Sequence, residues 1–147
     1  MNEKPNEQPS EDLSHPDLYR RRGDSVELLG MKCARCGHVA FPRQSYGCEK
    51  CGAAGDALSD AALSSSGTLA SYATVHMHQA KTIAAPFVIG EIALDAGPTV
   101  RATMVEPDDA AMQIGARVDG RLHPAPAPPE SGAPKLELRF ALTRAQA

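Results

Sequence analysis

The stretch KCARCGHVAFPRQSYGCEKC, residues 32–51, contains every cysteine of this 147-residue chain. Cys33 and Cys36 are separated by two residues, as are Cys48 and Cys51, and eleven residues lie between the two pairs. Each C-x-x-C closes a tight turn that points two thiolates at one place. Four thiolates at this spacing are typical of a tetrahedral structural metal site, so we expect the four cysteines to bind Zn²⁺.

Disulfides and redox chemistry are the alternatives to a metal. The chain begins MNEKPNEQPS, without the apolar core of a signal peptide, and has no run of about 18 apolar residues that could span a membrane. We therefore expect a cytoplasmic protein, in which free thiols favour metal binding over disulfides. A redox role for one C-x-x-C would leave the second pair without a function. Iron in a rubredoxin-like site stays open, because tetrahedral sulfur ligation accepts either metal.

The N-terminal third is predicted to be a tail, a helix and a small metal module. Residues 26–56 are too few to bury a core of their own, so we expect a zinc ribbon that depends on its metal. Residues 14–25 have helix signals, with Ser14 as N-cap, Gly23 just past the end and three arginines suited to a helix C-terminus. Residues 1–13, rich in Pro, Asn, Glu and Gln, are predicted to be disordered.

The remainder, residues 57–147, is predicted to be an OB-fold, which makes the chain mainly β. After a small-residue linker at 53–66, apolar and polar residues alternate in five segments, as expected for strands with one buried face. Proline and acids at the start of 106–115, with glycine at its end, predict a helix between the third and fourth strands. That combination is typical of a five-stranded OB-fold barrel. The five segments are 68–78, 87–94, 99–104, 116–122 and 135–142.

Single-stranded nucleic acid is a frequent ligand of OB-folds, but the composition disfavours it here. Such sites need a basic groove and aromatic platforms on which bases stack. From residue 53 onward the chain has seven Lys and Arg against ten Asp and Glu, and Tyr72, Phe87 and Phe140 are its only aromatic residues. Nucleic acid is therefore an unfavoured partner.

Two histidines and a proline-rich segment are the other candidate features of the barrel. His76 and His78, at i and i+2, could hold a metal or relay a proton, but no third ligand is fixed by spacing. A solvated strand face shared with Tyr72 and Thr74 is the favoured interpretation. Residues 123–134 contain repeated prolines and are predicted to be a stiff surface arm. No phosphate loop, nucleophile elbow or paired-carboxylate motif is present, so no catalytic residue is predicted.

The order of these segments and their amino-acid sequences resemble those of the acyl-CoA-associated zinc-ribbon/OB-fold family. The resemblance runs from about residue 17 to 143 and implies a short N-terminal helix, a rubredoxin-like zinc ribbon and an OB-fold. Two features of the family are reduced, since the helix keeps only Tyr19 as an aromatic residue and the linker has no tryptophan. The matching stretches are KCARCG (32–37), FPR (41–43), CEKCG (48–52), SGTLASYATVH (66–76), PFVIGEIALDAG (86–97) and IGARV (114–118).

The resemblance also implies a function and a partner. Members are accessory subunits of thiolases, thiolase-like aldolases, acyltransferases or MaoC-like hydratases, and the catalytic residues and the CoA thioester belong to the partner. The leading hypothesis is therefore a non-catalytic subunit of a thiolase-type enzyme, in a hetero-oligomer, that helps to order the CoA-substrate path. The alternatives are a subunit of a MaoC-like enoyl-CoA hydratase or of a thiolase-like aldolase or acyltransferase, and a single-stranded nucleic-acid-binding protein. The family's metal ligands map onto Cys33, Cys36, Cys48 and Cys51. We expect the ribbon and the proline-rich arm to contact the partner, and Arg43, at the ribbon tip, to be solvated unless it meets a CoA phosphate.

Overall fold

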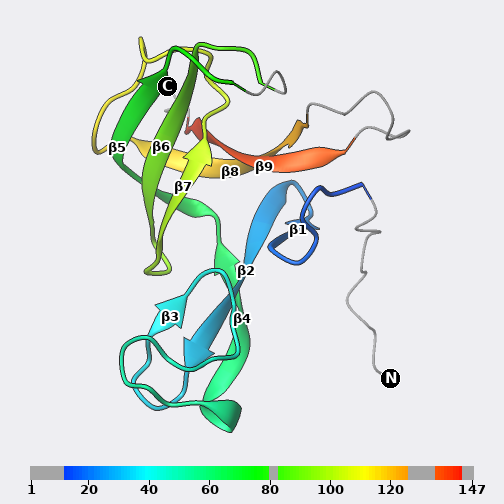
Figure 1. Ribbon diagram of the computed structural model, residues 1–147, viewed down its shortest axis with the longest axis vertical. Helices are drawn as coiled ribbons and strands as arrows, with labels where there is room; N and C mark the ends of the chain where they lie inside the picture. The colour runs from blue at the N-terminus through cyan, green and yellow to red at the C-terminus, as the bar shows by residue number, and fades with distance from the viewer. Residues whose placement is uncertain (1–11, 80–82, 126–134, 144–147) are drawn as a thin grey trace.

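The structure is a computed structural model that describes residues 12–79, 83–125 and 135–143. It contains two antiparallel sheets joined at Ser65, with the smaller sheet below the larger one in Figure 1. The smaller sheet consists of β1 (Tyr19–Arg22), β2 (Ser25–Cys33), β3 (Val39–Ala40) and β4 (Leu58–Ser64). The larger sheet consists of β5 (Ser66–Val75), β6 (Phe87–Leu94), β7 (Thr99–Thr103), β8 (Arg117–Pro124) and β9 (Leu136–Leu142).

The predicted N-terminal helix over residues 14–25 is wrong, because this segment forms a turn followed by β1. Gly23 has φ of 57° and lies in the turn that joins β1 to β2, where the sequence suggested the end of a helix. The extended backbone sends Arg20 and Arg22 to the same side, where both bind the carboxylate of Glu27. The arginines therefore neutralise a carboxylate across the hairpin and do not interact with a helix terminus.

Part of the predicted tail belongs to the core. Leu13, expected within the disordered residues 1–13, is 2% exposed and forms a parallel bridge with Leu136 of β9. The backbone N–H of Ser14 donates to Leu136 O at 2.8 Å, and the N–H of Leu136 donates to Asp12 O at 2.7 Å. Residues 1–11 lie outside the described residues.

The predicted linker at 53–66 is also wrong in most of its length, because Leu58–Ser64 form β4. This strand pairs with β2 over seven residues, from Glu27↔Ser64 to Cys33↔Leu58. Small residues such as Ala61 and Ala62 have weak strand propensity, so the long pairing partner and the burial of Leu63 decide the structure here. The linker is thus one side of the ribbon.

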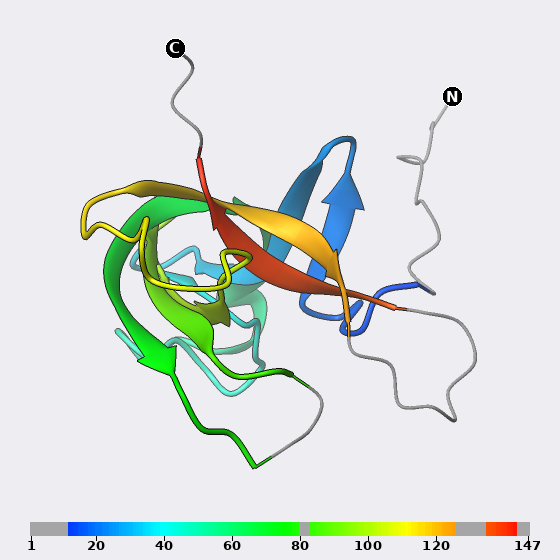
Figure 2. The ribbon, with the colours of Figure 1, turned by 90° about the horizontal axis from the view of Figure 1, so that it is seen from above.

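The five strands of the predicted OB-fold are confirmed. The sheet order is β7-β6-β5-β8-β9, and a parallel bridge between Met104 and Phe140 joins its two ends. Figure 2 shows the curved β5 to β7 with β8 and β9 running side by side across them. Leu69, Val88, Ile92, Val118 and Phe140 fill the interior, and each is fully buried.

No helix forms at 106–115, so that prediction is wrong. The segment consists of turns and bends, held by contacts to the barrel. Glu106 Oε1 accepts the N–H of Leu142 at 2.9 Å, and the N–H of Gly115 donates to Leu69 O at 2.8 Å. These long-range bonds replace the hydrogen bonds that a helix would supply, and within the described residues the one helical element is the 3₁₀ turn Gly55–Ala57.

A bulge in β5 changes which side chains face the barrel interior. The register with β6 shifts between Leu69 and Ser71, so Tyr72 lies opposite Gly90 and Thr74 opposite the buried Val88. Paired residues share a face, and Tyr72 and Thr74 therefore lie on the inward side of β5 near its end. The predicted solvated stripe is thus confirmed in part, since Tyr72, His76 and His78 are exposed, but Tyr72 and Thr74 do not lie on the outer face of β5.

Two further predictions concern segments that the structure covers only in part. The proline-rich arm at 123–134 begins in β8, and its residues 126–134 lie outside the described residues. Among the residues that are described, no helix is long and apolar enough to cross a membrane.

Candidate metal centre and the adjacent cleft

The two cysteine turns have the same backbone geometry. The N–H of Gly37 donates to Cys33 O and the N–H of Gly52 donates to Cys48 O, each at 2.8 Å. Both glycines have φ of 78°, a conformation that residues with a Cβ rarely adopt. Each glycine therefore closes its turn and leaves the two thiols of the pair on the inner side.

The four predicted ligands converge on one point. The Sγ atoms of Cys33, Cys36, Cys48 and Cys51 all lie within 4.8 Å of one another. Across the pairs, Cys33 Sγ lies 3.6 Å from Cys51 Sγ, and Cys36 Sγ lies 3.5 Å from Cys48 Sγ. A tetrahedral zinc with Zn–S bonds of about 2.3 Å needs sulfurs about 3.8 Å apart. The quartet therefore fits Zn²⁺, and the same geometry accepts iron.

The electrostatics of the quartet favour a bound cation. The backbone N–H of Cys51, with that of Lys50, lowers the pKa of Cys48 to about 6, and the N–H of Cys36 lowers the pKa of Cys33. The N–H of His38 also favours the thiolate of Cys36, yet burial and the neighbouring thiols raise the pKa of Cys36 to about 11. Four thiols this close cannot all ionise by themselves, and a divalent cation removes that conflict.

A contact outside the quartet joins the two turns. His38 Nε2 lies 2.6 Å from Glu49 Oε1, and these residues come from the first and second turns respectively. The turns also carry cations at equivalent positions, since Arg35 and Lys50 each precede the second cysteine of their pair. These cations offset part of the negative charge that four thiolates retain around one divalent metal.

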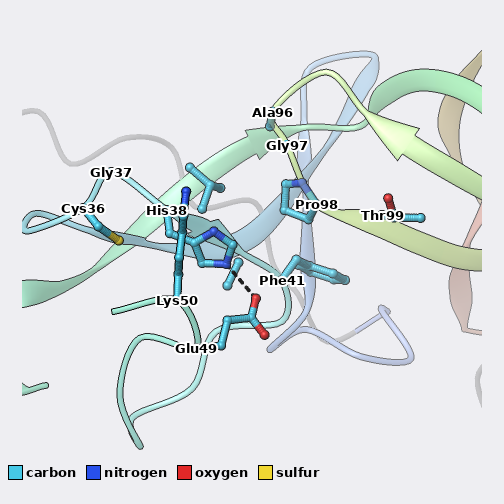
Figure 3. A pocket seen from close by; sticks show the side chains of 12 residues that line it. Cys36, Gly37, His38, Phe41, Glu49, Lys50, Ala96, Gly97, Pro98 and Thr99 are labelled. Atoms are coloured by element: carbon cyan, nitrogen blue, oxygen red, sulfur yellow. Dashed lines mark hydrogen bonds and ion pairs between the residues drawn. The ribbon is translucent and has the colours of Figure 1, made fainter. Parts of the chain in front are cut away.

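A cleft of about 610 Å³ lies beside the metal centre, between the ribbon and the β6–β7 turn of the barrel. Figure 3 shows Lys50 and the His38–Glu49 pair on the ribbon side, with Pro98 and Thr99 on the barrel side. Val39, Phe41, Ala96 and Pro98 supply apolar surface along it. Its mixed lining makes it a candidate binding site at a junction between modules.

The remaining candidate residues are not assembled into a second site. His76 is exposed, and the ring of His78 packs edge-on against Phe87 with centroids 5.5 Å apart. Among the described residues, the cysteine quartet is the one cluster of three or more residues suited to a metal. Arg43 pairs with Asp60 at 3.2 Å on the surface of the ribbon, which agrees with a solvated tip.

The ribbon contains an ordered loop that the sequence did not predict, and this loop presents an aromatic side chain. Tyr46 is 92% exposed, yet its loop is fixed by the side chain of Gln44. Gln44 Oε1 accepts the N–H groups of Tyr46 and Gly47, and Gln44 Nε2 donates to Gly47 O. A glutamine two residues before a tyrosine is too common a pattern to have indicated this arrangement.

Comparisons with known proteins agree with this architecture. Residues 22–57 match the family model of the ChsH2 rubredoxin-like zinc ribbon domain, and residues 60–123 match that of the ChsH2 C-terminal OB-fold domain. A DUF35 domain-containing scaffold protein of Methanothermobacter thermautotrophicus is 32% identical over 103 residues, which span 69% of this chain and 75% of that protein. The chain belongs to the DUF35 family.

A solved structure shares the DUF35 fold at lower identity. The structure described as Ltp2-ChsH2(DUF35) aldolase superimposes with a TM-score of 0.62 and 21% identity, covering 79% of this chain and 84% of that chain. The succession of a rubredoxin-like zinc ribbon and an OB-fold is thereby confirmed for this DUF35 protein. Its four cysteines have the arrangement expected of the zinc ribbon.

Proposed function

We propose that this chain is a non-catalytic accessory subunit that binds Zn²⁺ through its four cysteines and docks to an enzyme acting on acyl-CoA. The observation that carries the proposal is membership of the DUF35 family, together with the scaffold description of the archaeal relative. The structure contributes a second argument, since the four cysteines form the type of zinc site that stabilises a fold. All four positions are cysteines, and a catalytic zinc site normally keeps one position for water or substrate.

The proposal also names the class of enzyme to which the catalytic subunit belongs. The leading candidate is a thiolase-type enzyme whose CoA-thioester path this chain helps to order. The Ltp2-ChsH2 structure is described as an aldolase, and this favours an aldolase partner as the second candidate. In either case the proposal places the reacting residues in the partner, because the family resemblance carries no catalytic residue over to this chain.

The Tyr46 loop is the surface that best suits docking. Exposed tyrosines on fixed loops lose little conformational entropy on binding, and tyrosine is enriched among residues that dominate binding energy. Gln44 keeps the loop in one conformation before any partner arrives. We therefore place Tyr46 in the interface with the catalytic subunit.

Co-expression with a candidate acyl-CoA enzyme, either a thiolase or a thiolase-like aldolase, tests the proposal. We expect the two proteins to co-purify in a defined ratio, and the enzyme to lose activity or stability when this chain is omitted. Tyr46→Ala should weaken the complex about tenfold or more without altering the melting temperature. Met77→Ala, which removes an equally exposed apolar side chain from the barrel, is the matched control. Two proteins that elute separately, with enzyme activity independent of this chain, would reject the accessory role.

A further inference from the structure

The cleft between ribbon and barrel contains an unpaired edge of β3. Cys33 N–H donates to His38 O at 2.9 Å, so Cys33 and His38 form a hydrogen-bonded pair of the β2–β3 ladder. In an antiparallel ladder alternate residues turn their backbone groups to opposite sides. Ala40 therefore bonds to Met31, whereas the N–H and C=O of Val39 point away from β2. Among the described strands none other than β2 pairs with β3.

The cleft gives access to β3. Val39, Ala40 and Phe41 all line it. The opposite wall is the β6–β7 turn, which approaches so closely that a Cβ built on Gly97 would lie 4.0 Å from Val39 Cβ. The turn therefore touches the side chain of Val39 at one point, and elsewhere the cleft has β3 along one wall and the turn along another. That shape suits an extended chain, whose backbone can pair with β3 while its side chains alternate between wall and solvent.

Charge provides the second constraint. Lys50 lines the cleft, and within the described residues its ammonium group makes no hydrogen bond or ion pair. The other polar side chains at this end of the wall, His38 and Glu49, contact each other. One unpaired cation gives too few donors to hold a small anion by itself. A bound peptide segment could also form hydrogen bonds with the β3 edge and pack against Phe41 and Pro98. Such a segment would need only one carboxylate, to pair with Lys50.

We infer that this cleft receives an extended segment of the catalytic subunit, which adds a strand to the outer edge of β3 and places an Asp or Glu carboxylate against Lys50. The inference rests on the proposed accessory function and names the part of the partner that this chain recognises. Strand addition explains why the recognition site can be short, because backbone hydrogen bonds supply affinity and one side chain supplies specificity.

A charge-reversal pair tests the role of Lys50 in the full-length complex. Lys50→Glu should weaken binding of the co-expressed catalytic subunit about tenfold or more, because it opposes the partner's carboxylate. Arg35→Glu makes the same change at the equivalent position of the other cysteine turn. Arg35 itself does not line the cleft, so this variant should change affinity less than about twofold. Metal content of both variants should match that of the wild-type chain. Equal weakening by the two variants, or none by Lys50→Glu, would overturn the inference.

Amide hydrogen exchange tests the strand edge itself. The N–H of Val39 should exchange quickly in the free chain and slowly in the complex, whereas the N–H of Ala40 should be slow in both. If the complex forms and Val39 stays unprotected, the cleft is not the site, although the accessory function stands. If no complex forms with the wild-type chain, the accessory function and this inference both fail.

Discussion

The two ends of β2 lie in regions that are held together by different forces. Near its start, Val26 and Leu28 belong to the main apolar cluster, which includes the barrel residues Leu69, Ile92 and Phe140. At its end, Cys33 belongs to a second cluster that contains only Cys48 and Ala53 as further buried members. The first region has enough apolar contact to fold by burial, whereas the second needs the metal. The difference indicates that metal loss should unfold one end of the molecule before the other.

The largest effect is expected from removing one metal ligand. In Cys48→Ser the quartet loses a buried thiolate, and the binding free energy that folds such a module is lost with it, on the order of 10 kcal/mol. We expect the metal content to fall from one ion per chain to none. Amide protection should disappear for residues 33–58 and persist in β5 to β9.

Chelation of the wild-type chain provides the control, because it removes the ion and leaves the sequence intact. It should reproduce the exchange pattern of Cys48→Ser, and added zinc should reverse it. Elemental analysis, together with the red colour of a ferric tetrathiolate site, separates iron from zinc. A chain that purifies without stoichiometric metal, yet keeps residues 33–58 protected, would contradict the proposed role of the quartet.

A substitution in the barrel core tests the other region, because it removes apolar contacts and leaves the metal ligands in place. Phe140 is fully buried, and its neighbour in the parallel bridge, Met104, is 1% exposed. Phe140→Ala should lower the free energy of unfolding by about 3–5 kcal/mol, measured by urea denaturation. Metal content should stay at one ion per chain, because the ligands lie in the other cluster. Loss of metal in this variant would show that the two regions fold as one unit.

The part of the fold that the sequence predicts well depends on short-range patterns. Four cysteines within nineteen residues identify the ribbon turns, and this signal does not depend on how the rest of the chain folds. Alternation of apolar and polar residues likewise predicts β6, β7, β8 and β9. The ligands of the candidate site could therefore be named from sequence alone. The cleft could not, because β3 and the β6–β7 turn are brought together by the packing of two sheets.

The wrong predictions share a physical cause, which is that tertiary contacts override local signals. Residues 58–64 are small and weakly patterned, and they form β4 because β2 offers seven pairing positions. Residues 14–25 satisfy helix-capping rules, yet pairing of β1 with β2 and the Arg20–Glu27 contact stabilise a hairpin. The interruption of the β5 alternation at Ser71 was a sign of the bulge, since one inserted residue reverses every later side chain.

A smaller effect is expected at the hairpin between the two regions. Glu27 has a side chain that is 7% exposed, and it is bound by Arg20 and Arg22. Burial tends to raise the pKa of Glu27, but hydrogen bonds from Arg22 and Arg20 outweigh it and lower the pKa below its usual value. The ionised carboxylate therefore stabilises the fold above the unfolded-state pKa of about 4.3, and this contribution is lost as the pH falls through the folded-state value.

Replacing both arginines by methionine isolates the buried carboxylate. The double variant should be less stable than the wild-type chain at pH 7.5, because it leaves the buried carboxylate of Glu27 without its cations. Without the cations, burial should raise the pKa of Glu27. The stability difference from the wild-type chain should then shrink as the pH falls toward 5.5, and comparing the two at each pH cancels effects on the metal site. A difference that stays constant with pH would mean that the arginines act by packing.

The smallest effect is expected at an ion pair on the barrel surface. Arg117 Nη2 lies 2.5 Å from Asp95 Oδ2, and its hydrogen bond lowers the pKa of Asp95, but about half of each side chain is exposed. Water screens such pairs, so Arg117→Met should leave the urea midpoint nearly unchanged. Asp95 nevertheless begins the turn that forms one wall of the cleft. If Arg117→Met weakened binding of the catalytic subunit while stability stayed constant, the ion pair would be acting on the position of that turn, and the cleft would depend on the barrel as much as on the ribbon.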